Sequence, residues 1–109
     1  MSEKVNQLQM IEQNLQQLLS QRQQFQGQLV EVESALEELK KSEDAYKIVG
    51  NIMIKTAKDD LSKDLNEKKE KAELRVKTIE NQESKLKEKA ESIRKEVMQE
   101  LEKGDSKKE

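Results

Sequence analysis

The sequence contains no cysteine, histidine, proline or tryptophan, and its only aromatic residues are one Phe and one Tyr. Without Cys or His, the 109-residue chain has no thiol nucleophile, no histidine-based triad, no structural zinc site and no disulfide framework. Hydrophobic residues make up only 32% of the chain, so a core deep enough to enclose a catalytic pocket is not expected. We therefore expect no enzymatic activity, no cofactor and no metal site.

Charge and hydropathy exclude two further classes of partner. The 21 basic and 23 acidic residues nearly cancel, so no strong attraction to nucleic acid or to an anionic membrane is expected. The sequence shows no signal peptide and no stretch of roughly 18 apolar residues that would span a membrane. The absence of cysteine fits a reducing compartment, and we expect a cytoplasmic protein.

A charged fraction of 40% is also typical of disordered chains, but the apolar residues are periodic. Ten positions in the first part of the chain alternate spacings of three and four, and nine of them are apolar. They are Leu8, Ile11, Leu15, Leu18, Arg22, Phe25, Leu29, Val32, Leu36 and Leu39. This pattern predicts the a and d positions of a coiled coil. The exception, Arg22, either specifies the register of the coil or extends along the seam to solvent.

A second series with the same spacing follows and is less apolar. Its members are Leu65, Lys69, Ala72, Val76, Ile79, Glu83, Leu86, Ala90, Ile93 and Val97. Leu101 continues the series after a four-residue step, which would mark a stutter. Because the chain has no proline, both helices can run without interruption.

The segment between the two series predicts a β-hairpin. Two β-prone runs, 45–49 and 52–56, flank Gly50-Asn51, a two-residue step suited to a tight turn. This turn would pair Val49 with Ile52, Ile48 with Met53, and Lys47 with Ile54. Both faces are mainly apolar and both edges are unpaired, so we expect the hairpin to drive oligomerisation. The candidate assembly residues are Tyr46, Ile48, Val49, Gly50, Ile52, Met53 and Ile54.

These patterns predict a mostly α protein with one domain, residues 1–109. We expect a first helix at about 4–43, the hairpin at about 45–56, a second helix at about 58–102 and a disordered tail at 103–109. Thr56 and Asp59 resemble a capping box at the start of the second helix, and Gly104 would end it.

The run Ala45-Tyr46-Lys47-Ile48-Val49-Gly50-Asn51-Ile52-Met53-Ile54-Lys55 resembles the hairpin signature of β-type prefoldin subunits. In that signature a Tyr-Lys pair leads to a Gly and a short aliphatic strand. Flanking segments are also similar to archaeal members, namely 34–39, 58–61 and 78–83. The resemblance extends from about Leu8 to Leu101. The sequence departs from the family where it lacks a short Pro-containing lead, and where Asn81 replaces a frequent Arg.

The resemblance implies a molecular chaperone. Prefoldins assemble two α-type and four β-type subunits into a hexamer, in which the hairpins form a β-barrel body and antiparallel coiled coils project from it. The implied partners are α-type prefoldin subunits, further copies of this chain, unfolded polypeptides held without nucleotide hydrolysis, and a group II chaperonin. The alternative is a structural coiled-coil tethering protein, in which the hairpin only fixes subunit geometry and no client binds.

In an antiparallel helical hairpin, the free end combines the start of the first helix with the end of the second. The candidate client-binding residues there are Val5, Leu8, Met10, Ile11, Ile93, Val97, Met98 and Leu101. Those on the two seams also have the spacing required to zip the helices together. Met10 and Met98 lie off the seams, and we expect them to be exposed, as suits an adaptable binding surface.

Overall fold

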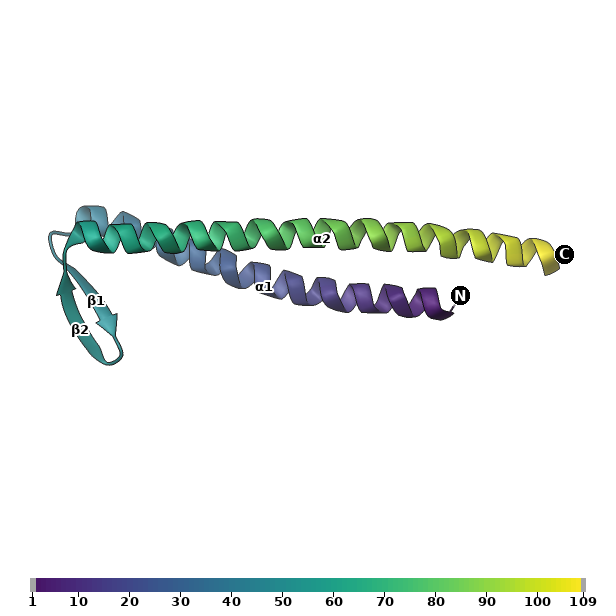
Figure 1. Cartoon of the computed structure of the whole chain (residues 1–109), viewed down its shortest axis with the longest axis horizontal. Helices are drawn as coiled ribbons and strands as arrows, with labels where there is room; N and C mark the ends of the chain where they lie inside the picture. The colour runs from purple at the N-terminus through teal and green to yellow at the C-terminus, as the bar shows by residue number, and fades with distance from the viewer. Residues whose placement is uncertain (1, 109) are drawn as a thin grey trace. The chain divides into compact units, whose positions relative to one another are not determined.

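The computed structural model describes residues 2–108, with side chains from residue 3 to residue 103. Helix α1 (Ser2–Lys41) is followed by strands β1 (Ala45–Val49) and β2 (Ile52–Thr56) and by helix α2 (Lys58–Lys108) (Figure 1). The predicted order of helix, hairpin and helix is therefore confirmed.

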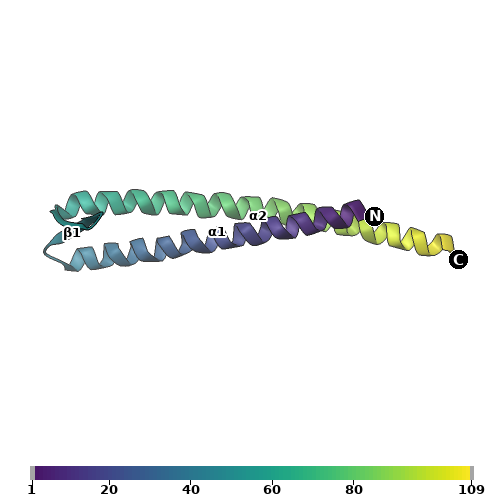
Figure 2. The ribbon, with the colours of Figure 1, turned by 90° about the horizontal axis from the view of Figure 1, so that it is seen from below.

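The chain forms two compact units, and each helix contributes to both. The terminal unit combines the residues up to Arg22 with those from Thr78 onward, and the hairpin unit comprises Gln23–Lys77. Within each unit, α1 and α2 lie side by side and run in opposite directions (Figures 1 and 2).

Helix α1 ends two residues before the predicted boundary at about 43, and Ser42 caps its last turn. The Ser42 backbone N–H and side-chain hydroxyl both donate to the Glu38 carbonyl, at 3.1 and 3.0 Å. These bonds satisfy a carbonyl that the end of a helix would otherwise leave unpaired. Lys40 and Lys41 in the last turn are favourably placed against the negative end of the helix dipole.

Helix α2 starts at the predicted residue, but Thr56 is not its cap. Thr56 is the last residue of β2, and the Ala57 carbonyl accepts the first helical bond from the Leu61 N–H at 3.1 Å. The predicted capping box is therefore wrong. Asp59 and Asp60 lie in the first turn, where their negative charges interact favourably with the positive end of the helix dipole.

The other end of α2 also differs from the prediction. The helix continues to Lys108, past the predicted stop at Gly104 and into the tail that was predicted to be disordered. A glycine costs a helix only about 1 kcal/mol relative to alanine, and no proline follows to end it. Glu109 lies outside the described residues.

Every position of the two predicted seams is buried or half-buried. In the terminal unit, Ile11, Ala90 and Ile93 form a buried cluster. Four partly buried side chains pack against this cluster, namely Leu8, Leu15, Leu86 and Val97. In the hairpin unit, Leu39 and Ala72 are buried, and the Arg75 guanidinium lies 6.0 Å from the centre of the Phe25 ring. The seam residues thus form the core of each unit.

The predicted stutter at Leu101 is wrong. Leu101 is 44% exposed, whereas Glu100 is half-buried and lies three residues after Val97, which keeps the alternation of three and four. The seam therefore continues without a break onto a charged side chain.

Candidate functional site

The hairpin presents an apolar surface that the other side chains described, those of residues 3–103, leave exposed. The strands pair as predicted, with Val49 opposite Ile52, Ile48 opposite Met53 and Lys47 opposite Ile54. Gly50 adopts a φ of 62°, whereas Asn51 does not have a positive φ, which defines a type II′ turn. All the apolar residues predicted for assembly are exposed, at 49% to 70%, namely Tyr46, Ile48, Val49, Ile52, Met53 and Ile54.

The base of the hairpin is held against the rest of its unit. Ala45 is buried, and the Lys47 ammonium lies 3.7 Å from the Asp64 carboxylate of α2. At the start of β1, Asp44 lies 3.4 Å from the Lys55 ammonium. Beyond this base the two strands project away from the helices (Figure 1). An apolar two-stranded ribbon with open edges and open faces is marginally stable at best in water, and a covering partner would stabilise it.

The predicted client-binding residues divide into two groups in the terminal unit. Leu8, Ile11, Ile93 and Val97 pack in or against the buried cluster, so they zip the helices. The other four are exposed, namely Val5 (40%), Met10 (63%), Met98 (58%) and Leu101 (44%). The predicted exposure of Met10 and Met98 is therefore confirmed, and the free end presents apolar side chains that zipping does not use.

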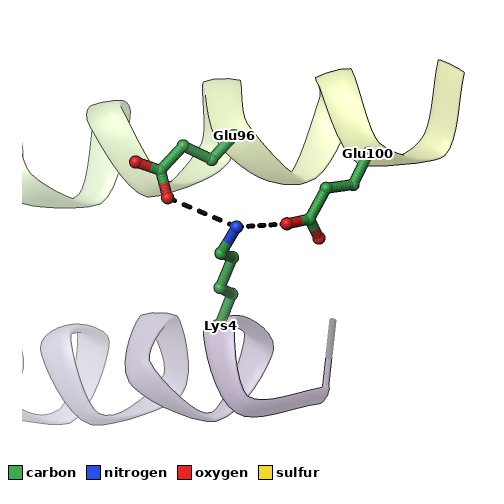
Figure 3. Close-up of polar contacts among 3 residues, drawn as sticks. All are labelled: Lys4, Glu96 and Glu100. Carbon is green, nitrogen blue, oxygen red and sulfur yellow. Dashed lines mark hydrogen bonds and ion pairs between the residues drawn. The ribbon is translucent and has the colours of Figure 1, made fainter. Parts of the chain in front are cut away.

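A cluster of three charged residues joins the helices at this free end. The Lys4 ammonium donates to Glu100 of α2 and lies 3.5 Å from the carboxylate of Glu96 (Figure 3). Lys4 and Glu100 both fall on seam positions, since Lys4 precedes Leu8 by four residues and Glu100 follows Val97 by three. We call this cluster the ionic clasp.

The clasp shifts the pKa values of Lys4 and Glu100. The hydrogen bond from Lys4 holds the pKa of Glu100 below its ordinary value. The same bond, with the negative charges of Glu100 and Glu96, raises the pKa of Lys4. Both shifts favour the charged forms, so the clasp is ionised over the neutral pH range.

A second polar layer crosses the core of the terminal unit. The Nε of Arg22 donates to Oε1 of Glu83 at 2.7 Å, and Nη2 donates to Oε2 at 3.4 Å. Glu83 is only 6% exposed, so this carboxylate depends on Arg22 for its neutralisation. The Arg22 side chain is partly exposed, and its guanidinium is paired with Glu83, a contact that a register-specifying role requires.

The sequence patterns did not identify the clasp. The signal was available, because extending each series by one step reaches Lys4 and Glu100. A charged side chain gives no apolar signal at a seam position, and no local pattern shows that two charged seam positions face each other.

Among residues 2–108, no helix combines the length and the apolar character that a membrane crossing requires. Over the same residues, no three acidic side chains come together in a way that would hold a metal ion. Two antiparallel helices joined by an uncovered apolar hairpin define a subunit of an oligomeric coiled-coil protein.

Comparison with known proteins identifies this class. Residues 2–104 match the sequence profile of the prefoldin subunit family. The chain is 49% identical over 87 residues to the prefoldin subunit beta of Archaeoglobus fulgidus, an alignment covering 77% of this chain and 75% of the relative. It is 41% identical over 100 residues to the prefoldin subunit beta of Pyrobaculum islandicum, covering 89% and 80%.

The fold agrees with a solved structure of the same kind. The crystal structure of the prefoldin beta subunit from Thermococcus strain KS-1 superposes with a TM-score of 0.87 at 34% identity, covering 92% of this chain and 90% of that chain. The chain belongs to the prefoldin family, a family of molecular chaperones. The resemblance in the hairpin sequence is thereby confirmed.

Proposed function

We propose that this chain is a subunit of an ATP-independent holdase, which captures unfolded polypeptides at the free end of its terminal unit and passes them to a group II chaperonin. The observation that carries the proposal is the exposure of Val5, Met10, Met98 and Leu101. They lie beside a seam whose own residues already pack the two helices together. Exposed apolar side chains that are not needed for folding are typical of binding surfaces. Methionine suits clients of many shapes, because its unbranched thioether side chain adapts to irregular surfaces.

We further propose that the hairpin assembles this chain with α-type prefoldin subunits and with further copies of itself. The six exposed apolar residues of β1 and β2 support this, because the strand edges and both faces need cover. The relatives named above are beta subunits, a name that implies a partner of another type. The hairpins of several subunits would then close into the barrel that the family resemblance implies.

Holding would require no nucleotide. The three glycines, Gly27, Gly50 and Gly104, are isolated from one another, so the chain has no glycine-rich loop of the kind that binds phosphate. Energy for capture would come from burying apolar surface, and several arms acting together would raise the affinity by multivalency.

The test uses the full chain co-expressed with an α-type subunit. Native mass measurement is expected to give a hexamer, and the complex is expected to suppress the aggregation of a chemically unfolded protein equally with and without ATP. A complex that assembles but leaves aggregation unchanged would contradict the holdase proposal and favour the tethering alternative. Hand-over is tested separately, by adding a group II chaperonin with ATP and measuring refolding of the held client.

A further inference from the structure

The terminal unit contains a groove of about 400 Å³, lined by side chains of α1 and α2. Its floor includes Leu18 and Leu86, two seam residues that remain half-buried. The walls are polar and exposed, with Asn14, Gln17 and Gln21 on α1 and Gln82 and Lys85 on α2. The groove is thus an apolar strip between two rows of hydrogen-bonding side chains.

The wall on α1 carries no charge. From Val5 to Gln21 the only charged residue of α1 is Glu12, which does not line the groove. Over residues 3–103, no hydrogen bond of the protein engages the side chain of Asn14, Gln17 or Gln21. A carboxamide both donates and accepts hydrogen bonds, as a peptide group does. This wall therefore matches the exposed backbone of an extended polypeptide.

The wall on α2 carries a single charge, which is positive. Of its lining residues Gln82, Lys85 and Leu86, only Lys85 is ionisable. Lys85 lines the groove, and Lys89 lies one helical turn further on the same face. Among the described side chains, neither ammonium has a carboxylate within 4.0 Å, in contrast to Lys4 and Arg22. A ligand with carboxylates would complement this wall.

We propose that the groove binds an extended segment of unfolded polypeptide in which an apolar side chain is accompanied by carboxylates. The apolar side chain would contact Leu18 and Leu86, while the backbone hydrogen-bonds to the carboxamides and the carboxylates pair with Lys85 and Lys89. Carboxylates two residues apart on an extended chain are separated by about 6.6 Å. The four-residue interval between the two lysines corresponds to a rise of about 6 Å, which is a close match.

The α1 wall of the groove shares a helix face with one residue of the proposed client-binding surface. Met10 precedes Asn14 by four residues, so it lies on the same face of α1 and is 63% exposed. A segment held in the groove can therefore extend towards the free end. The inference rests on the proposed holdase function and names the class of client segment, acidic and apolar, that this site selects.

The test measures binding of short fluorescent peptides to the assembled full-length protein. One peptide combines leucine with two aspartates two residues apart, a second replaces the aspartates by lysines, and a third replaces leucine by serine. We expect the first to bind at least about tenfold more tightly than either of the others, because both the charge and the apolar contact are needed. Methyl NMR signals of Leu18 and Leu86 are expected to shift with that peptide.

Variants with the same change of charge separate the groove from the general charge of α2. Lys85→Glu with Lys89→Glu should abolish the preference for the acidic peptide and favour the basic one. Lys87→Glu with Lys95→Glu changes the net charge equally outside the groove and should preserve the preference. Equal effects of the two double variants, or unshifted Leu18 and Leu86 signals, would overturn the proposal.

Aggregation suppression by the same samples distinguishes the two proposals. A protein that suppresses aggregation but does not select the acidic apolar peptide refutes the groove and leaves the holdase function intact. A protein that binds this peptide in the groove but never suppresses aggregation supports the groove and refutes the holdase function.

Discussion

Arg22 and Glu83 interrupt the two apolar seams at the same level, and each is the other's partner. Two hydrogen bonds join them, at 2.7 and 3.4 Å, and the carboxylate is buried. Apolar seam residues repeat every heptad, so a slip of seven residues would still place apolar side chains against one another. Such a slip would leave Glu83 without its cation, and the pair therefore penalises the wrong register.

We expect Arg22→Met to destabilise the terminal unit, because it leaves the buried Glu83 carboxylate unpaired. The cost should be close to 3 kcal/mol, the lower end of the range for breaking a buried ion pair, since Arg22 is itself partly exposed. Urea unfolding followed by circular dichroism measures this. Arg22→Leu with Glu83→Leu should recover most of the lost stability. In this double variant, spin labels at positions Gln16 and Glu88 should detect a second register, in which the helices are displaced by one heptad, about 10 Å. A double variant as unstable as Arg22→Met, or one that keeps a single register, would contradict this account.

The ionic clasp is expected to keep the free end closed. Lys4→Glu places three carboxylates together, so the first turns of α1 should separate from α2 and exchange their amide hydrogens faster. Adding Glu96→Lys and Glu100→Lys to Lys4→Glu restores opposite charges and should restore slow exchange. Because the clasp is near the surface, its effect should weaken as salt is raised. Exchange that is the same in all three proteins would show that apolar packing alone closes this end.

The clasp should also respond to pH at both extremes. The lowered pKa of Glu100 means that its carboxylate stabilises the closed end above the pKa it has in the unfolded chain, and that this stabilisation disappears as the pH falls through the lowered pKa. The raised pKa of Lys4 means that its stabilisation is complete below the ordinary lysine pKa and disappears as the pH rises through the raised value. NMR titration of Glu100 should show its pKa rising in Lys4→Met. A Glu100 pKa that does not change in this variant would refute the assigned cause.

The hairpin is expected to control assembly. Replacing Ile52 and Ile54 together by Asp puts charges on an apolar face that is exposed in the isolated chain. The complex should dissociate into monomers or dimers, because covering these carboxylates in an interface would require their desolvation. Light scattering measures the mass, and far-UV circular dichroism should show that the helices persist. Ser84→Asp with Ser92→Asp adds the same charge outside the hairpin and should leave assembly intact. An intact hexamer after the hairpin change would refute assembly through this surface.

The exposed methionines separate client capture from packing. Met10→Ser with Met98→Ser should leave the assembly and its melting temperature nearly unchanged, because both side chains lie off the seams and are exposed. More chaperone should then be needed to suppress aggregation, since each methionine contributes about 1.5–3 kcal/mol when fully covered. Leu15→Ser removes a side chain that packs against the buried cluster and should lower the melting temperature instead. If the methionine pair lowers stability as Leu15→Ser does and capture is unaffected, the two methionines are packing residues.

Several features of this protein follow from the sequence because they depend on local patterns. Spacings of three and four place Ile11, Leu39 and Ile93 in the core, since helical geometry fixes which residues share a face. A two-residue turn at Gly50-Asn51 sets the whole register of β1 and β2. The helix ends were less well predicted, because capping by Ser42 and the continuation of α2 through Gly104 depend on small competing energies.

The pairing of side chains between the helices was decided only in the tertiary structure. A heptad pattern states that Arg22 and Glu83 lie on seams, but not that they lie opposite each other. The same holds for Lys4, which meets Glu96 and Glu100 only after the helices are aligned. That alignment is a longitudinal offset between two helices, and the apolar repeat is compatible with several offsets spaced by one heptad. The sum of packing, hairpin geometry and ion pairing selects one of them, so residues far apart in the sequence become partners only in the folded protein.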